Sequence, residues 1–201
     1  MRENNLKNTK TIYIVAGANG SGKTTFAKEF IKIPNIPFLN ADEIEKEFNP
    51  NDTNGGKIRA GRIFFNRLYD LLKKNNDFVI ESTLSGKSLI KILKKLKRDN
   101  VKIILLYIFL DSVEIAINRV QIRVKEGGHN IPTKDIIRRY FRSINNFWNI
   151  YKNLVDEWEL FYNGEDNIIQ AALGSKNNFN MINEEKFKIF KRGFHAKSRN
   201  L

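Results

Sequence analysis

Cysteine is absent from the 201-residue chain, which excludes disulfide bonds, thiolate zinc sites and thiol catalysis. No segment rich in proline, glycine or serine divides the chain. The longest apolar run, Ile103 to Leu110, is far shorter than the ~20 residues of a membrane-spanning helix. The polar N-terminus lacks the apolar core of a signal peptide. We therefore expect one cytoplasmic domain over residues 1–201, with no membrane partner.

Acidic residues are too few to balance the basic ones, and the formal net charge is +13. Such a charge is compatible with nucleic acid, an anionic surface or acidic small substrates as partners, but we favour the simpler explanation of a genome rich in lysine and asparagine codons. The lysines of residues 73–97 are spread through expected helices and are not interleaved with aromatic residues, as they would be on a base-stacking surface. We therefore do not expect nucleic acid as a partner. A nucleotide-dependent nucleic-acid-binding ATPase is kept as an alternative function.

Strand-like and helix-like patterns alternate along the chain, which predicts an α/β fold. Gly127-Gly128 is typical of a helix end, and Pro132-Thr133 of the start of the next helix. A small β segment is expected near residues 168–173. The expected architecture is a P-loop NTPase fold, in which helices flank a parallel sheet of about five strands and ligands bind at the carboxyl ends of those strands. The strands are predicted at residues 11–16, 36–40, 78–81, 101–110 and 158–162.

The segment Gly17 to Thr24 matches the phosphate-binding motif G-x-x-x-x-G-K-[ST] and lies between an expected strand and an expected helix. In such a loop, backbone N–H groups surround the phosphate oxygens, and the helix presents its positive end to them. Lys23 is expected to reach the β- and γ-phosphates, and the Thr24 hydroxyl to ligate magnesium. The nucleotide-binding residues are therefore predicted to be Gly17, Ala18, Asn19, Gly20, Ser21, Gly22, Lys23, Thr24 and Thr25.

Other motifs favour a kinase over a switch or a motor. The Asn-Lys-x-Asp box of guanine-nucleotide switches is absent. The strand 78–80 ends in Glu81-Ser82-Thr83, where a motor ATPase usually carries an Asp-Glu pair. Phosphoryl transfer to a small molecule mainly requires charge neutralisation, exclusion of water and an oriented acceptor. The chain has candidates for each of these requirements.

Two carboxylates are candidates for handling the acceptor. Asp42 follows the second expected strand, where it is placed to take a proton from a substrate hydroxyl, although aspartate is also a common helix N-cap. Glu81 is expected at the end of the strand beside the P-loop strand. There it binds a substrate hydroxyl or a magnesium-bound water, or is simply an exposed strand-end carboxylate.

Arginines on two successive helices predict a lid over about residues 119–143. Arg119 and Arg123 are four residues apart and share a helix face. The pair Gly127-Gly128 provides a hinge before a second arginine-bearing helix. A lid of this kind excludes water and brings positive charge to the transferred phosphate. A solvated basic face is the alternative interpretation. The arginines of the second helix are Arg138, Arg139 and Arg142.

Taken together, these motifs resemble the zeta-toxin family of P-loop kinases, especially its short chromosomal members. The resemblance spans about residues 12–163. It implies an ATP- and magnesium-dependent kinase that phosphorylates the 3′-hydroxyl of UDP-N-acetylglucosamine and so poisons cell-wall precursor synthesis. It also implies a small helical antitoxin as partner. The segments that carry it are residues 17–25, 40–44, 81–84 and 119–143.

The resemblance also assigns roles to individual residues. Asp42 would be the base, and Lys23 and Thr24 would bind phosphate and magnesium. Glu81 and Thr83 would contact the substrate, and Asn163 would lie near the adenine. The lid arginines would be Arg119, Arg123 and Arg139, with the choice between Arg138 and Arg139 left open. The chain has a compact C-terminal part with no evident extra sugar-binding region, so another metabolite, a nucleoside or a nucleic-acid end remains an alternative acceptor.

Overall fold

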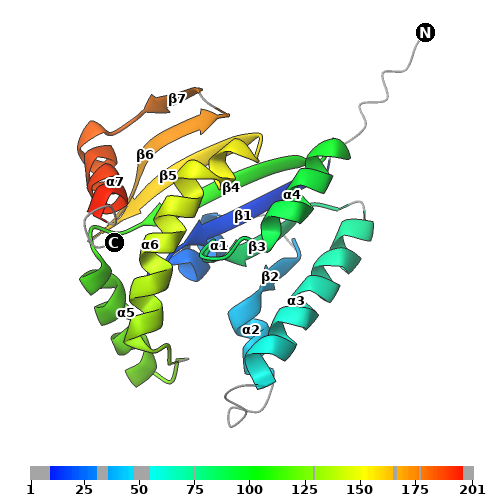
Figure 1. The fold of residues 1–201 in the computed structure, drawn as a ribbon, viewed down its shortest axis with the longest axis horizontal. Helices are drawn as coiled ribbons and strands as arrows, with labels where there is room; N and C mark the ends of the chain where they lie inside the picture. The colour runs from blue at the N-terminus through cyan, green and yellow to red at the C-terminus, as the bar shows by residue number, and fades with distance from the viewer. Residues whose placement is uncertain are drawn as a thin grey trace.

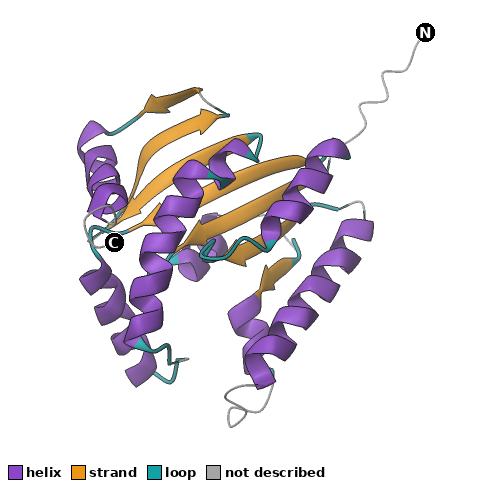
Figure 2. Cartoon of the chain, in the orientation of Figure 1, coloured by secondary structure: helices purple, strands orange, loops and turns teal. Residues whose placement is uncertain are grey.

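The computed structural model describes residues 10–30, 36–47, 55–74, 76–128, 130–164, 167–176 and 178–196. Its centre is a seven-stranded sheet in the order β2-β3-β1-β4-β5-β6-β7 (Figure 2). The first five strands in this order are parallel, and β6 and β7 are antiparallel to their neighbours. The bounds are β1 Thr11–Gly17, β2 Phe38–Asn40, β3 Phe78–Ser82, β4 Lys102–Phe109, β5 Glu157–Asn163, β6 Ile168–Ser175 and β7 Asn178–Met181.

The predicted α/β architecture is confirmed, but the expected number of about five strands is wrong. The expected β segment near residues 168–173 is a full strand, β6, which pairs with β5 and so extends the sheet. The seventh strand, β7, has the sequence NFNM and is exposed along its whole length. A strand at the sheet edge with so little burial lacks the apolar pattern that marks a strand in a sequence.

Eight helical segments accompany the sheet in the described part of the chain (Figure 1). The long helix that follows Pro132 is followed by a separate 3-10 turn, η1. None of the described helices is long and apolar enough to cross a membrane. The bounds are α1 Lys23–Phe30, α2 Ala41–Lys46, α3 Gly55–Lys73, α4 Leu89–Arg98, α5 Val113–Lys125, α6 Thr133–Asn149, η1 Tyr151–Asn153 and α7 Glu184–Ala196.

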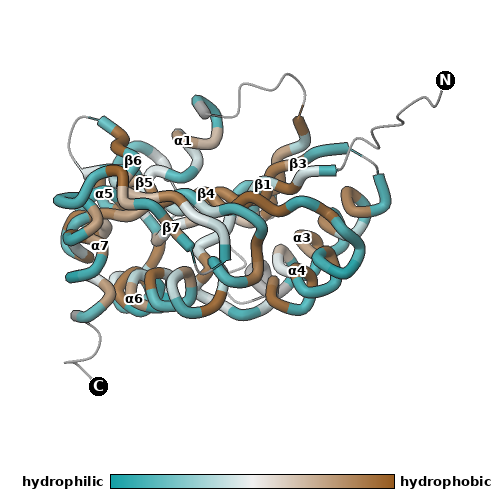
Figure 3. The backbone as a smooth tube through the Cα atoms, turned by 90° about the horizontal axis from the view of Figure 1, so that it is seen from above, coloured by the Kyte–Doolittle hydropathy of each residue, from teal (hydrophilic) through white to brown (hydrophobic). Residues whose placement is uncertain are grey.

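The two faces of the sheet are covered unequally. Helices α3, α4 and α6 cover one face, and α1 lies on the other (Figure 3). The larger hydrophobic core lies under the first group and contains Ile12, Ile14 and Leu105 among many others. A smaller cluster, which includes Val15 and Phe26, lies under α1. Because both faces of β1 and β4 are buried, these strands are almost continuously apolar in sequence.

Helix α6 is anchored to the sheet by aromatic and polar contacts. The rings of Tyr107 on β4 and Phe147 on α6 stack with centroids 4.2 Å apart. The Tyr107 hydroxyl lies 2.8 Å from the Ser143 Oγ, and the Tyr140 hydroxyl donates to the Leu110 carbonyl at 3.0 Å. Burial raises the pKa of both tyrosines, so their hydroxyls stay protonated. The sheet-facing side of α6 is therefore held in one position.

Candidate functional site

The P-loop runs from the end of β1 into the start of α1, as the motif predicts. Gly20 and Gly22 adopt φ angles of +78° and +88°, which side chains rarely tolerate. A Cβ on Gly20 would also meet the backbone of Ala116, and one on Gly22 would meet the side chain of Asn163. The glycines of the motif are therefore required by both backbone conformation and space.

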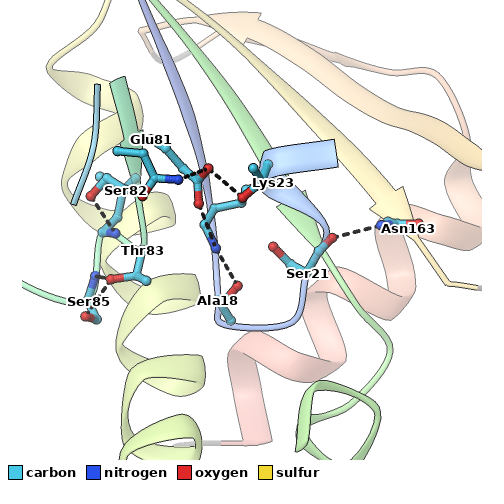
Figure 4. A network of polar contacts seen from close by, with 11 residues as sticks. Ala18, Ser21, Lys23, Glu81, Ser82, Thr83, Ser85 and Asn163 are labelled. Carbon is cyan, nitrogen blue, oxygen red and sulfur yellow. Dashed lines mark hydrogen bonds and ion pairs between the residues drawn. The ribbon is translucent and has the colours of Figure 1, made fainter. Parts of the chain in front are cut away.

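A buried polar cluster, which we call the phosphate-site cluster, joins the P-loop to the ends of β2 and β3 (Figure 4). It consists of Lys23, Thr24, Asn40 and Glu81. Glu81 accepts hydrogen bonds at Oε2 from Thr24 Oγ1 (2.8 Å) and from Asn40 Nδ2 (2.9 Å). Lys23 Nζ lies 3.9 Å from Glu81 Oε1 and donates to the Ala18 carbonyl at 2.9 Å. Lys23 and Glu81 are only 8% and 7% exposed, so this ion pair is largely shielded from water.

The topology explains why these residues meet. Strand β3 lies between β2 and β1, with Asn40 opposite Glu81 and Glu81 opposite Val15 in the parallel registers. All three strands therefore end at the same edge of the sheet, where ligands of such sheets bind. The expected position of Glu81 beside the P-loop strand is confirmed. Sequence reasoning assigned no role to Asn40, although its place at the end of a strand was a usable signal.

The cluster suits a nucleotide with magnesium. Magnesium prefers oxygen ligands in a nearly octahedral arrangement, and usually takes one or two carboxylates together with substrate phosphates. The Thr24 hydroxyl and the Glu81 carboxylate provide such oxygens side by side. Two further buried atoms of the loop, Asn19 Oδ1 and Ser21 Oγ, have no hydrogen-bond partner among the described residues. Buried polar atoms normally have a partner, so these two are available to a ligand.

A chain of hydrogen bonds connects the P-loop to β5 and α5. Asn163 Nδ2 donates to the Ser21 carbonyl at 2.9 Å (Figure 4). Arg119 Nη1 donates to the Asn163 carbonyl at 3.0 Å, and Nη2 donates to the Gly164 carbonyl. Arg119 therefore holds the loop after β5, and Asn163 in turn holds the P-loop.

The segment after Glu81 is rigidly shaped. Leu84 is buried with a φ of +50°, a strained value for leucine. Asn146 of α6 fixes this conformation by donating to the Leu84 carbonyl at 2.7 Å, and Ser82 Oγ accepts from the Leu84 N–H at 3.1 Å. Thr83, a predicted substrate contact, lies beside this turn with its hydroxyl 2.9 Å from that of Ser85. The sequence did not reveal a role for Asn146, because no pattern in the sequence of α6 indicates that this polar side chain is buried.

The predicted lid region forms two packed helices, α5 and α6. Helix α5 ends as predicted. Gly127 has a φ of +85°, and the Gly128 N–H donates to the Arg123 carbonyl at 2.8 Å in a Schellman arrangement. Arg138 is paired with Asp135 at 2.8 Å on the surface, while Arg123 and Arg139 are partly buried.

Asp42 is the second residue of α2, and this helix begins directly after Asn40, the last residue of β2. Its backbone therefore lies next to the phosphate-site cluster, but its side chain lies outside what the structure describes. His129, beside the glycine pair, is likewise outside the described residues. Thr25 is exposed on the first turn of α1.

The fold and this site define the class of the protein. A P-loop ends the central strand of a parallel sheet, and a lysine, a threonine and a carboxylate converge on it. These features are those of a P-loop nucleotide-binding protein. The profile of the zeta toxin family matches residues 2–172, and the chain belongs to that family. The predicted class, a P-loop kinase of the zeta toxin type, is thereby confirmed.

One curated relative supports the assignment at the sequence level without adding a function. It is an uncharacterised protein of Haemophilus influenzae that is 36% identical over 127 residues, which cover 62% of this chain and 88% of the relative.

Two solved structures share the fold. The AvrRxo1-ORF1:-ORF2 complex with ATP contains a chain that superimposes with a TM-score of 0.69 at 17% identity over 90% of this chain. The chain spans 63% of the length of that neighbour. The PezAT chromosomal toxin-antitoxin system of Streptococcus pneumoniae gives a TM-score of 0.58 at 15% identity and covers 94% of this chain and 87% of the other.

Proposed function

We propose that the protein transfers the γ-phosphate of ATP to a hydroxyl group of a sugar nucleotide such as UDP-N-acetylglucosamine. The observation that carries the proposal is the phosphate-site cluster. Lys23 and Thr24 of the P-loop share the carboxylate of Glu81 at the edge where three parallel strands end. Membership of the zeta toxin family supports the same chemistry. The neighbouring complex that was solved with ATP supports ATP as the phosphate donor.

In this proposal each member of the site has one task. The Lys23 ammonium leaves the Ala18 carbonyl and neutralises charge on the β- and γ-phosphates. Thr24 and Glu81 would hold magnesium, which would supply positive charge to the phosphates. Asp42 takes the proton of the acceptor hydroxyl as its oxygen bonds to the γ-phosphorus. The bond between that phosphorus and ADP breaks in the same step, and ADP leaves with the electron pair. Thr83, on its fixed turn, orients the acceptor.

We propose Arg123 and Arg139 as the arginines that approach the transferred phosphate. Arg138 has a carboxylate partner in Asp135, whereas Arg139 has no ion pair among the described residues. Arg139 therefore reaches a phosphate without breaking an ion pair with a described residue. Arg123 is proposed from the family resemblance alone. Arg119 already donates to the Asn163 and Gly164 carbonyls, so it supports the nucleotide site from the side of β5.

A small helical antitoxin is the proposed partner. The PezAT neighbour is a toxin-antitoxin system, and its chain shares this fold over most of its length. We place the antitoxin over the nucleotide site, because a protein that covers the P-loop would keep ATP out.

The decisive experiment uses the full chain with magnesium and γ-labelled ATP. It offers UDP-N-acetylglucosamine, nucleosides and oligonucleotide ends as acceptors in parallel reactions. Label on the sugar nucleotide is the expected result. Label on another acceptor would replace the substrate but keep the kinase. Free phosphate with every acceptor unlabelled would contradict the proposed transfer.

Asp42→Asn tests the base in the same assay. We expect transfer to fall about 10²–10⁴-fold, because a general base contributes rate enhancement of that order. ATP affinity, measured by calorimetry, should stay unchanged, since the substitution leaves the P-loop intact. Lys23→Ala is the comparison variant, because it should weaken both ATP binding and transfer. An unchanged transfer rate in Asp42→Asn would remove Asp42 from the mechanism.

A further inference from the structure

A wide basic groove lies at the edge of the molecule opposite the P-loop. It has a volume of about 1270 Å³ and is lined by the C-terminal part of α3, by residues along the length of α4, by the segment that follows α4 and by the residue before β1. Figure 1 shows α3 and α4 ending near the beginning of β1, whereas the phosphate-site cluster lies at the other end of that strand. The groove is therefore separate from the kinase site.

Helix α4 gives the groove its charge. Its sequence, LIKILKKLKR, contains five cations and no carboxylate. Lys91, Lys95 and Arg98 are exposed and line the groove, and none of them forms an ion pair with another described residue. Among the cations of α4, Lys97 has a carboxylate partner in the described part of the chain, namely Asp156. Among the described residues that line the groove, the acidic one is Asp99.

This charge pattern is unfavourable for the helix itself. Lys91 and Lys95 are four residues apart on one face, and like charges at that spacing repel each other. Lys91 also lies in the first turn, where the positive end of the helix dipole disfavours a cation. The helix dipole therefore explains Arg98 in the last turn but not Lys91. An anion bound in the groove would relieve the repulsion.

The rest of the lining indicates which kind of anion fits. Tyr69 of α3 lines the groove and is 49% exposed, so part of its surface is accessible to a ligand. The apolar side chains of Leu72, Ile92 and Leu96 also contribute to the lining. Proteins that bind single-stranded nucleic acid combine a cationic groove with aromatic rings on which bases stack. An acidic peptide would satisfy the cations but would make no specific use of Tyr69.

We propose that this groove binds single-stranded nucleic acid, with Lys91, Lys95 and Arg98 on phosphates and Tyr69 stacked on a base. Lys10 has a different role. Its ammonium group donates to the Leu71 carbonyl at 2.9 Å and to the Leu72 carbonyl at 3.1 Å, which holds the end of α3 in place. The proposal does not depend on the kinase activity or on the identity of its acceptor.

The test measures fluorescence anisotropy of a labelled single-stranded oligouridylate of roughly 12 nucleotides, long enough for one such site. The full chain is titrated at several salt concentrations. The groove variant is Lys91→Gln, Lys95→Gln and Arg98→Gln together. The matched control removes the same charge elsewhere, through Lys28→Gln, Lys188→Gln and Arg192→Gln. Lys28 is on α1 and the other two residues are on α7.

We expect the groove variant to bind on the order of 10²-fold more weakly at about 50 mM salt. The slope of log affinity against log salt should fall by about 2, because each phosphate contact on a single strand contributes about 0.7. Tyr69→Ala should weaken binding about fivefold or more, because a base loses its stacking partner. The slope of log affinity against log salt should stay unchanged, because the phosphate contacts remain. The control variant should keep the wild-type slope. Thermal unfolding verifies that α4 remains folded, since glutamine is a good helix former.

Three results would overturn the proposal. Equal losses in the groove and control variants would mean that only net charge matters. Loss of binding in Lys23→Ala, with normal binding in the groove variant, would place the oligonucleotide in the kinase site. Competition by polyglutamate as strong as that by unlabelled RNA, with no effect of Tyr69→Ala, would assign the groove to an acidic protein segment. Normal RNA binding by Lys23→Ala together with loss in the groove variant supports the proposal.

Discussion

Glu81 contacts three other described residues of the site, Thr24, Asn40 and Lys23. One of its oxygens accepts from Thr24 and Asn40, and the other faces the Lys23 ammonium. A buried carboxylate is stable only with such partners, because desolvation of an unpaired charge is costly. The Lys23 ammonium group contacts both Glu81 and the Ala18 carbonyl.

Glu81→Gln distinguishes a metal-positioning role from acceptor binding. The substitution keeps the size of the side chain but removes its charge. We expect the apparent magnesium affinity, measured as the magnesium concentration for half-maximal transfer, to weaken about 10–100-fold, in line with the loss of other groups that support a metal. Raised magnesium should partly restore transfer, and the KM for the acceptor should change little. A raised acceptor KM at unchanged magnesium dependence would instead place Glu81 on the substrate.

The P-loop depends on an element far away in sequence, the end of β5. Asn163 occupies the space beside Gly22 and donates to the Ser21 carbonyl, and Arg119 of α5 holds Asn163 from behind. The conformation of the P-loop thus depends on contacts from β5 and α5 as well as on its own glycines.

Gly22→Ala should disrupt this arrangement. The added methyl group meets Asn163, and a φ of +88° costs alanine about 1–2 kcal/mol. We expect ATP affinity to fall about tenfold or more, which corresponds to about 1.4 kcal/mol. Gly61→Ala is the matched control, because it lies within α3 and has open space at its Cβ. The control should leave ATP binding unchanged and raise the unfolding free energy by about 0.5–1 kcal/mol. Similar ATP affinities for the two variants would contradict the required Gly22 conformation.

The turn after β3 should depend on α6 in the same way. Asn146→Ala removes the donor to the Leu84 carbonyl, which leaves a buried acceptor unpaired at a cost of about 1–3 kcal/mol. We expect a lower unfolding free energy in urea and a raised KM for the acceptor, because Thr83 lies on this turn. Asn149→Ala, on an exposed turn of the same helix, serves as control. The positioning role would be ruled out if Asn146→Ala lost stability but kept the wild-type KM.

At the scale of the whole molecule, buried tyrosines make stability sensitive to alkaline pH. Burial raises the pKa of Tyr151 from 10.0 to about 12, and those of Tyr107 and Tyr140 also lie well above their usual value. The folded protein therefore retains protons that the unfolded chain releases above pH 10. Stability that is fully present below pH 10 should be lost as pH rises from about 10 to 12, by up to about 1.4 kcal/mol per pH unit for each tyrosine.

Urea unfolding at a series of pH values between about 9 and 12 measures this dependence. Tyr151→Phe removes one titrating group and should make the decline shallower by up to about 1.4 kcal/mol per pH unit. An identical slope in wild type and Tyr151→Phe would show that Tyr151 does not contribute.

The sequence by itself determined the P-loop, the alternation of parallel strands and helices, and the membership of the zeta toxin family. These features are local, since a loop motif and apolar periodicity are properties of neighbouring residues. It also placed Glu81 beside the P-loop, because the ends of adjacent parallel strands meet at one edge. The strand number was underestimated, because the polar strand β7 carries no such pattern.

Only the tertiary structure decided which distant residues support the site and which surface carries the charge. Asn146, Asn163 and Asn40 act through contacts with segments 41 to 142 residues away, and no local pattern records such pairs. The lysines of α4 are interleaved with no aromatic residue in the sequence. In the folded protein, Tyr69 of α3 lines the same groove. Side chains from separate helices form one surface only after the helices pack, and packing is a property of the whole fold.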